Sequence, residues 1–177
     1  RDVELDRVVN ALVSACRRLS ERRHGALIVL ERDTGLQDYV DTGVELDALV
    51  ADELLQTIFF PSTALHDGAV IIRGNRIVAA AAVLPLAESI VADGHLGTRH
   101  RAAVGITEQT DAIALVVSEE TGTISMARNG RMVRHLDERR LATLLQAMLA
   151  PRRTSTKKSR SLLQRRGSDE LQDKRAA

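Results

Sequence analysis

The sequence predicts an α/β domain in which a mixed, twisted β-sheet of about six or seven strands is flanked by helices. First, stretches with helical spacing of apolar residues are interspersed with short, β-branched apolar runs. Second, Gly74-Asn75 and Asn129-Gly130 each separate two apolar runs, as in a β-hairpin, which excludes a purely parallel sheet. Third, a chain of 177 residues, 44% of them apolar, is long enough for one domain with a real core.

Four segments have the apolar spacing of helices, and about four or five helices are expected in all. The first covers residues 2–21. The second, 46–59, is predicted to end before Pro61, because the residue preceding a proline disfavours helical backbone. The third, 99–108, follows a Gly-Thr start, and the fourth, 137–149, places leucines and a methionine on one face.

The strands are short and rich in valine, isoleucine and alanine. Residues 25–31 (GALIVLE) and 112–118 are predicted as buried strands, residues 69–83 as a hairpin, and residues 119–136 as two further strands. Three segments receive no strand or helix. They are the turn-rich stretch 33–46, the loop 61–68 and a long, irregular connection over 84–97.

Composition and charge limit the kind of protein that this is. A single cysteine, Cys16, excludes an internal disulfide and any multi-cysteine zinc site. No apolar run approaches the roughly 20 residues that span a bilayer, and no signal peptide is visible. Residues 151–177 hold nine Lys/Arg and three Asp/Glu, whereas the preceding 150 hold 16 and 21. We therefore expect an acidic domain over 1–150 and a basic, disordered tail over 151–177.

Two loop motifs carry groups suited to binding an anion. In LHDGA, His66 and Asp67 precede a predicted strand, and Gly68 allows a tight turn or a close approach to a ligand. In GTRHR (97–101), three basic residues follow Thr98, a predicted helix cap, although a helix N-terminus already carries partial positive charge. Exposed amides and guanidiniums there suit a phosphate. The alternatives are an ordinary Asp-Gly turn and a solvated basic turn that pairs with nearby acids such as Glu88.

Two further motifs complement the first pair. In SEET (118–121), paired carboxylates end a buried strand and suit a hard divalent cation, although they also fit a solvated hairpin turn. In VLPLAES (83–89), Leu84 and Pro85 form an apolar edge for a purine base, or simply pack. Together the four motifs describe a nucleoside triphosphate site. The sequence contains neither a Walker A motif nor G-x-G-x-x-G.

The motifs LHDGAVII, LPLAES, LGTRHRAAVGITEQTDA and VVSEETGTIS closely resemble the diadenylate cyclase (DisA-N, or DAC) domain, especially that of the membrane-anchored CdaA-type bacterial enzymes. The resemblance covers residues 1–149. It implies condensation of two ATP molecules into cyclic di-AMP with release of two pyrophosphates, and a need for Mn²⁺, Mg²⁺ or Co²⁺. It also implies a homodimer in which two clefts meet face to face, because each 3′-hydroxyl must reach the other ATP's α-phosphate.

The resemblance also assigns roles to residues. Asp67, Arg99 and Arg101 are expected to be catalytic, with Asp67 deprotonating or orienting the ribose 3′-hydroxyl. The expected nucleotide-binding residues are Gly68, Ala69, Leu84, Pro85, Thr98, Arg99, His100, Arg101, Ser118 and Glu119. The expected metal ligands are His66, Asp67, Glu119 and Glu120. Close relatives often carry an aromatic residue where this chain has Val83, so loss of stacking on the base is expected to cost on the order of 1 kcal/mol of affinity.

Location and partners follow from the resemblance alone. It implies attachment to the cell membrane through an N-terminal anchor that this chain lacks, with a cytoplasmic catalytic domain that is soluble as a fragment. Expected partners are ATP, cyclic di-AMP, a second copy of the chain, a membrane regulator and a phosphoglucosamine mutase, with no nucleic acid.

Three other functions stay open: a catalytically silent nucleotide sensor with the same pocket, a nucleotidyltransferase acting on another acceptor, and a nucleic-acid-binding domain. The intact His66, Asp67 and arginines argue against the sensor, and the acidic, aromatic-poor body argues against nucleic acid. The basic tail is expected to stay solvated or to contact anionic lipid.

Overall fold

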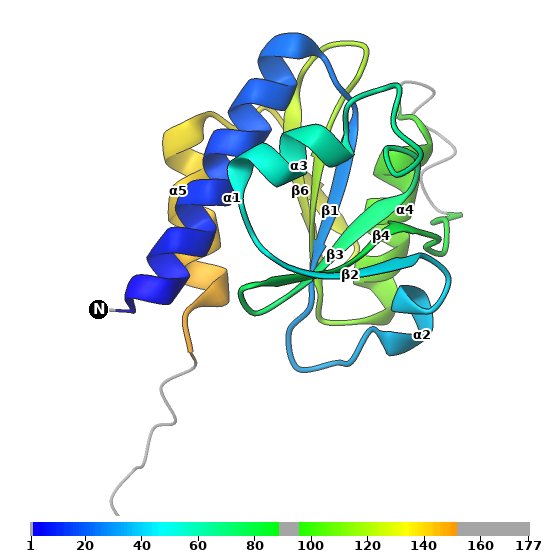
Figure 1. Ribbon diagram of the computed structural model, residues 1–177, viewed down its shortest axis with the longest axis horizontal. Coiled ribbons are helices and arrows are strands. Elements are labelled where there is room, and N and C mark those ends of the chain that lie inside the picture. The colour runs from blue at the N-terminus through cyan, green and yellow to red at the C-terminus, as the bar shows by residue number, and fades with distance from the viewer. Residues whose placement is uncertain (1, 89–95, 152–177) are drawn as a thin grey trace, which may run out of the picture.

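A computed structural model describes residues 2–88 and 96–151 of the chain. Within these residues, seven strands form one sheet in the order β2-β4-β3-β1-β5-β6-β7, and five helices cover its two faces (Figure 1). The strands are β1 (Ala26–Leu30), β2 (Val44–Leu49), β3 (Ala69–Arg73), β4 (Arg76–Ala82), β5 (Ile113–Val117), β6 (Ile124–Arg128) and β7 (Arg131–Val133). The helices are α1 (Val3–Arg22), α2 (Gln37–Val40), α3 (Asp52–Ile58), α4 (Thr98–Gln109) and α5 (Glu138–Leu149). The predicted fold class is confirmed.

The central strands separate two hydrophobic cores. Every residue of β1 and of β5 is buried. Because successive side chains of a strand point to opposite faces, Ile28 and Leu30 join a core beneath α1, α3 and α5, whereas Leu27 and Val29 join one beneath α2 and α4. Figure 1 shows α1 and α5 on one side of the sheet and α4 on the other. The predicted buried strands 25–31 and 112–118 are thus confirmed.

Strand directions determine which loops meet at each end of the sheet. The strands β1 and β3 pair in parallel, with Ile28 beside Val70, and all the other pairs are antiparallel. The amino-terminal ends of β1 and β3 therefore share one edge with the carboxyl-terminal ends of β4 and β5. The loops around residues 66–68, 83–86 and 118–120 all open at this edge.

The prediction of one helix over 46–59 is wrong. Residues 44–49 form the edge strand β2, and the helix α3 begins at Asp52. Apolar residues on both sides of this boundary happen to fall at helical spacing, whereas the pairing of β2 with β4 depends on residues distant in sequence. A register shift between Glu45 and Ala48 bends β2, and Asp47 has a positive φ of 49°. Arg76 holds this bulge through the carboxylate and carbonyl oxygens of Asp47, at 3.0 and 2.8 Å.

The basic helix is confirmed as α4, but its start differs from the prediction. Gly97 is the N-cap and Thr98 the first helical residue, and no side chain caps this end. Inside α4, Gly105 allows the loop after β4 to lie directly on the helix, because a Cβ there would lie 1.9 Å from the Pro85 carbonyl oxygen. The Ala87 amide donates to the Arg101 carbonyl at 3.0 Å, so this loop is fixed to the first turns of α4.

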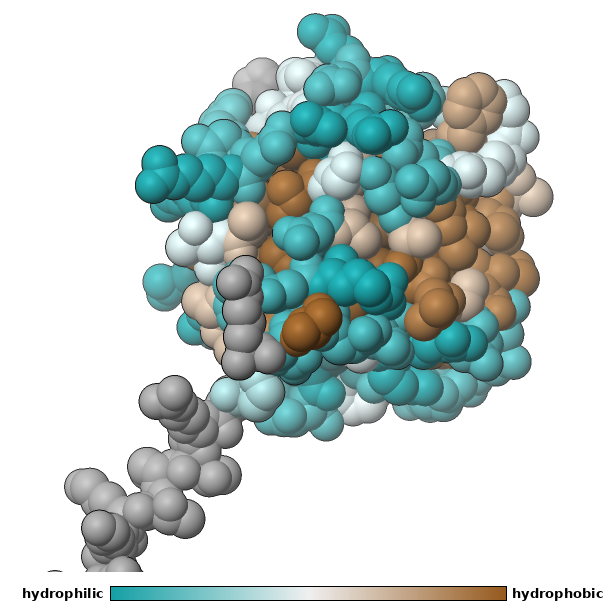
Figure 2. Space-filling view, turned by 60° about the vertical axis from the view of Figure 1, so that its left-hand side comes forward, coloured by the Kyte–Doolittle hydropathy of each residue, from teal (hydrophilic) through white to brown (hydrophobic). Residues whose placement is uncertain are grey.

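The surface has both polar regions and a region where apolar residues gather. In Figure 2, which turns the α1 and α5 side forward, hydrophilic residues cover the top and bottom of the face and apolar residues gather toward its right-hand side. Among the described residues, the exposed large apolar side chains are those of Val3, Val44, Leu49, Phe60, Val83, Leu86 and Val133. No helix within the described ranges is both long and apolar enough to cross a bilayer. The predicted tail lies outside the described residues, apart from Pro151.

Candidate functional site

A cleft of about 900 Å³ opens at the edge of the sheet where β5 ends. It is lined by residues 66–68, 81–84, 97–100 and 117–120, together with Leu27, Leu86 and Ala102. Four motifs that are far apart in the sequence therefore share one cavity. Ten of the predicted site residues line it, namely His66, Asp67, Gly68, Leu84, Thr98, Arg99, His100, Ser118, Glu119 and Glu120.

Three predicted site residues do not line this cleft. Ala69 is fully buried at the start of β3. The Pro85 carbonyl faces Gly105 of α4. Arg101 is half-buried, and its carbonyl supports the loop after β4 by accepting from the Ala87 amide. One guanidinium of the basic motif, that of Arg99, thus borders the cleft, whereas two were predicted to form the anion site.

The 66–68 loop is held in a fixed conformation. Gly68 has a φ of 99°, and a Cβ there would lie within 3.0 Å of the Ala81 and Ala82 backbone. Only glycine fits this position without strain. The His66 Nδ1 lies 2.7 Å from the Thr63 carbonyl, which can only accept, so Nδ1 carries the proton. In the neutral ring, the His66 Nε2 then has a lone pair for a ligand, and the adjacent Asp67 is exposed.

Arg99 lies over a glycine that the motifs do not include. A Cβ on Gly25, the residue before β1, would lie 2.6 Å from the Arg99 guanidinium carbon. The absence of a side chain at Gly25 gives the guanidinium its place against the backbone. Arg99 Nη1 also lies 3.3 Å from a carboxylate oxygen of Glu119. Sequence reasoning missed Gly25, for which the available signal was a glycine directly before a fully apolar strand.

His100 is buried at the base of the cleft, with 6% of its surface exposed. Burial lowers the pKa of His100, the nearby charges of Arg134 and Arg99 lower it further, and Glu120 opposes them. The ring is thus neutral at neutral pH. Among the described residues, nothing pairs with the His100 Nε2 or with the buried Nε atoms of Arg99 and Arg101. Unpaired buried polar atoms are costly, and those of Arg99 and His100, which both line the cleft, fit a site that a ligand completes.

The acidic residues stand on a turn that α1 supports. The Ser118 hydroxyl accepts from the amides of Glu120 and Thr121, both at 3.3 Å, and leaves Glu119 and Glu120 exposed. The turn closes at Gly122, whose carbonyl accepts from the Ser20 hydroxyl at the end of α1 at 2.5 Å. Gly122 has a φ of 75°, and a Cβ there would lie 2.6 Å from the Ser20 carbonyl oxygen. Close contact with α1 therefore fixes where the carboxylates stand.

The predicted metal ligands do not form a preassembled cage. In the part of the chain that the structure describes, no three His, Cys, Asp or Glu side chains are grouped as metal ligands. Magnesium and similar ions in nucleotide enzymes use one or two carboxylates together with substrate phosphates. The exposed Asp67 and the free Nε2 of His66 suit a metal of this shared kind.

The fold and the cleft together define an α/β nucleotide-binding domain. The chain belongs to the family described as DAC, the DisA bacterial checkpoint controller nucleotide-binding family, whose model matches residues 13–132.

Curated relatives and solved structures agree with this family. The chain is 52% identical over 141 residues to the cyclic di-AMP synthase CdaA of Bacillus subtilis, and 48% identical over 142 residues to a diadenylate cyclase of Listeria monocytogenes. Each match covers 80% of this chain and 52% of the relative, so the chain spans about half the length of these proteins. The crystal structure of a DacA double mutant from Staphylococcus aureus matches 81% of this chain and 96% of that one, with 45% identity and a TM-score of 0.79.

A second solved structure is that of a hypothetical membrane spanning protein from Bacillus cereus. It shares 49% identity with this chain, covering 72% of this chain and 62% of the other, and the TM-score is 0.69.

Proposed function

We propose that this chain is the catalytic part of a diadenylate cyclase, which condenses two ATP molecules into cyclic di-AMP and releases two pyrophosphates. The observation that carries the proposal is the shared cleft, which joins Asp67, the basic start of α4 and the acidic turn after β5. The family membership and the names of the relatives support it.

The geometry of the cleft suggests how one ATP is held. The apolar edge at Val83 and Leu84 receives the adenine. Thr98, Arg99 and His100 receive the triphosphate, because amides and a guanidinium at a helix start attract phosphate oxygens. Since Arg101 does not line the cleft, its proposed role is to hold the loop after β4 through its carbonyl. Ala69, which pairs with Ala82 at the start of β3, and Pro85, whose carbonyl faces α4, are proposed to act by holding the backbone that borders the cleft.

The proposed reaction forms one bond and breaks one bond at each α-phosphorus. The 3′-oxygen of one ribose bonds to the α-phosphorus of the other ATP, the bond to the leaving pyrophosphate breaks, and Asp67 accepts the hydroxyl proton. Arg99 stabilises the negative charge that develops on the leaving group. Two such steps close the ring.

A divalent cation is part of the proposal. His66, Asp67, Glu119 and Glu120 are the residues that would hold Mn²⁺, Mg²⁺ or Co²⁺. The ion would neutralise phosphate charge and make the α-phosphorus easier to attack.

Catalysis by this route requires two copies of the chain. One cleft holds one ATP, and each 3′-hydroxyl must face the other molecule's α-phosphate, so two clefts must meet about a two-fold axis. The same proposal includes attachment of the longer protein to a membrane, where a regulator and a phosphoglucosamine mutase are further partners. The description of the Bacillus cereus relative as membrane spanning supports the attachment.

The test is to incubate the chain with ATP and Mn²⁺ and to identify the product by chromatography over a wide range of protein concentration. We expect cyclic di-AMP, with a rate per chain that rises steeply with protein concentration as the homodimer forms. Nucleotide binding without product would instead favour a silent sensor. Transfer of adenylate to an added acceptor, without cyclic product, would favour another nucleotidyltransferase.

A further inference from the structure

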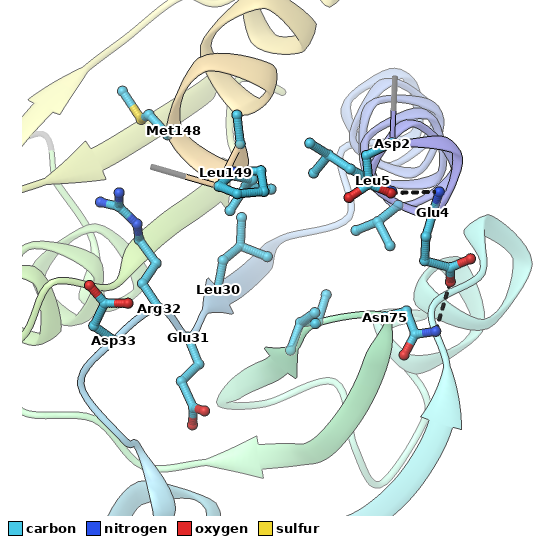
Figure 3. Close-up of a pocket in the computed structure, with 15 residues that line it drawn as sticks. Asp2, Glu4, Leu5, Leu30, Glu31, Arg32, Asp33, Asn75, Met148 and Leu149 are labelled. Atoms are coloured by element: carbon cyan, nitrogen blue, oxygen red, sulfur yellow. Dashed lines mark hydrogen bonds between the residues drawn. The ribbon is translucent and has the colours of Figure 1, made fainter. Parts of the chain in front are cut away.

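A second cavity, of about 490 Å³, lies at the opposite end of the sheet from the cleft. The antiparallel pairing of β1 with β5 places Ala26 beside Val117 at the cleft end and Leu30 beside Ile113 at the other end. The five residues of β1 therefore separate the two cavities by roughly 16 Å. The second cavity is bordered by α1, α5, the end of β1 and the β3–β4 turn (Figure 3).

The cavity has an apolar floor and an acidic rim. Its apolar lining includes Leu5, Val8, Leu30, Ile72, Met148 and Leu149. Figure 3 shows Leu5, Leu30 and Leu149 facing this space from α1, β1 and α5. Its charged lining consists of Asp2, Glu4, Glu31, Asp33 and Arg32, four acids against one base.

Two of these rim acids already have basic partners. Arg7 pairs with Glu4 at 3.1 Å and Arg73 pairs with Glu31 at 2.7 Å. The carboxylate of Asp2 accepts from the amides of Glu4 and Leu5 and is exposed to solvent. Asp2 and Asp33 thus supply most of the attraction for a basic partner at the rim.

The chain itself supplies a basic segment at this cavity. Pro151, at the end of α5, lines the cavity, and the segment 152–177 begins there. This segment holds nine Lys/Arg and three Asp/Glu, and its adjacent Leu162 and Leu163 stand between basic residues. Leu162 is the eleventh residue after Pro151, and such a length spans at most roughly 36–40 Å when extended. The leucine pair can therefore return to the floor of the cavity.

We propose that this cavity is the docking site of the chain's own C-terminal segment. Leu162 and Leu163 contact the apolar floor, and the basic residues on either side of them face the acidic rim. The volume lies within the roughly 300–1,000 Å³ that is usual for binding pockets. Since the cavity is at the far end of the sheet from the cleft, the docked segment leaves the nucleotide site open. The inference does not depend on the proposed function.

Disulfide trapping in the full chain tests this docking. Asn75→Cys places a thiol on the rim and Ser161→Cys places one beside the leucine pair. Ala147→Cys, paired with the same Ser161→Cys, is the matched control, because Ala147 is exposed on α5 and does not line the cavity. Cys16 does not interfere, because it is fully buried and burial raises its pKa to about 12.

Under mild oxidation at low protein concentration, we expect the rim pair to close roughly tenfold faster than the control pair, because docking raises the local thiol concentration. Adding Leu162→Ser and Leu163→Ser should bring the rim pair down to the control rate, and salt should slow it. Mass spectrometry identifies the linked peptides. Equal rates for the two pairs, or a rim rate that the leucine substitutions leave unchanged, would overturn the proposal.

Discussion

Gly25 shows how one absent methyl group positions a charged side chain. The Arg99 guanidinium occupies the space that a Cβ on Gly25 would need. For Gly25→Ala we expect an intact fold, because the end of a flexible arginine can move aside. We expect nucleotide affinity to fall about tenfold, because Arg99 loses its alignment with the phosphates and one charge-assisted hydrogen bond is worth about 1.5–3 kcal/mol.

Titration with an ATP analogue measures the nucleotide affinity, and thermal unfolding separately measures the stability of the fold. Gly35→Ala is the matched control, because nothing lies within 4 Å of a Cβ at that position. Affinity that stays unchanged in Gly25→Ala would show that the position of Arg99 does not matter for binding.

Asp67 is the residue on which the chemistry of the proposal depends. It is exposed in the cleft, next to a glycine that fixes its loop. Asp67→Asn keeps the size of the side chain but cannot accept the hydroxyl proton. We expect cyclic di-AMP formation to fall at least about 100-fold, while binding of an ATP analogue in the absence of metal changes little. Retained turnover would remove Asp67 from this role.

The site residues that could be predicted from the sequence are polar or charged residues at positions where the predicted helix or strand does not favour them. Arg99 and His100 crowd a helix start, and Glu119 and Glu120 follow a fully apolar strand, so both groups stand out before any folding is known. Gly25 and Arg134 do not stand out, because their roles arise from packing against residues far away in the sequence. Thr98 was predicted as a cap on local grounds, whereas the backbone places Gly97 at that position.

Among the elements, α4 has an unusual requirement for a small residue. Alanine normally stabilises a helix interior by about 1 kcal/mol relative to glycine. At Gly105 the sign is reversed, because a Cβ would meet the Pro85 carbonyl at 1.9 Å, and the backbone there cannot yield easily. We expect Gly105→Ala to lower the free energy of unfolding by about 1–3 kcal/mol or more. Chemical denaturation measures this loss, and a variant as stable as the parent would refute the contact.

The connection between β1, β3 and α2 contains a carboxylate that makes stability depend on pH. Burial raises the pKa of Glu31, but hydrogen bonds from Arg73 and the Leu36 amide outweigh it, so the pKa lies below its usual 4.5. A lowered carboxylate pKa stabilises the fold above the unfolded-state pKa, and this stability is lost as the pH falls through the folded-state pKa.

Unfolding by denaturant between pH 3 and pH 7 checks this contribution. We expect the parent to be more stable than Glu31→Gln near neutral pH, and the difference to shrink once the pH falls below about 4.5. Glu45→Gln, at an exposed position on the edge strand β2, is the control for removing one carboxylate from the surface. A difference between parent and Glu31→Gln that is constant with pH would contradict the role of the ion pair.

Elements differ in how far the sequence predicts them. The central strands β1 and β5 are short, continuous apolar runs rich in β-branched residues. Their bounds were therefore predicted within a residue or two. β2 was missed because its alternation of apolar and polar residues, VELDAL, is short and overlaps an apolar spacing that also fits a helix. Its identity depends on pairing with β4, which local spacing does not contain. The short helix α2 was missed for a similar reason, because four residues offer too little periodicity.

At the scale of the whole molecule, the fold brings together loops whose individual signals were weak. Strand direction alone places the ends of β4 and β5 beside the starts of β1 and β3, and this arrangement was not predicted from any one motif. The complementarity of the motifs indicated a shared site over 66–69, 97–101 and 118–120, and of these residues all but Ala69 and Arg101 border one cleft.

If the cleft binds nucleotide as proposed, the whole domain should gain stability from it. A ligand at about 100 times its Kd adds about 2.7 kcal/mol, which for a domain of this size raises Tm by roughly 5–10 °C. An ATP analogue with Mn²⁺ should produce such a rise in differential scanning fluorimetry, and the same analogue should have a much smaller effect on a variant with Arg99→Ala. An unchanged Tm at saturating nucleotide would count against the proposed function.

The helix α1 gives the domain a mechanical link between its two ends. Its 20 residues form a rod about 30 Å long. Near its beginning, Asp2 and Leu5 border the second cavity. Near its end, the Ser20 hydroxyl donates a hydrogen bond to the turn that carries Glu119 and Glu120. One continuous helix therefore contacts both the second cavity and the turn that carries the two carboxylates, so the positions of these distant sites are defined relative to the same rigid element.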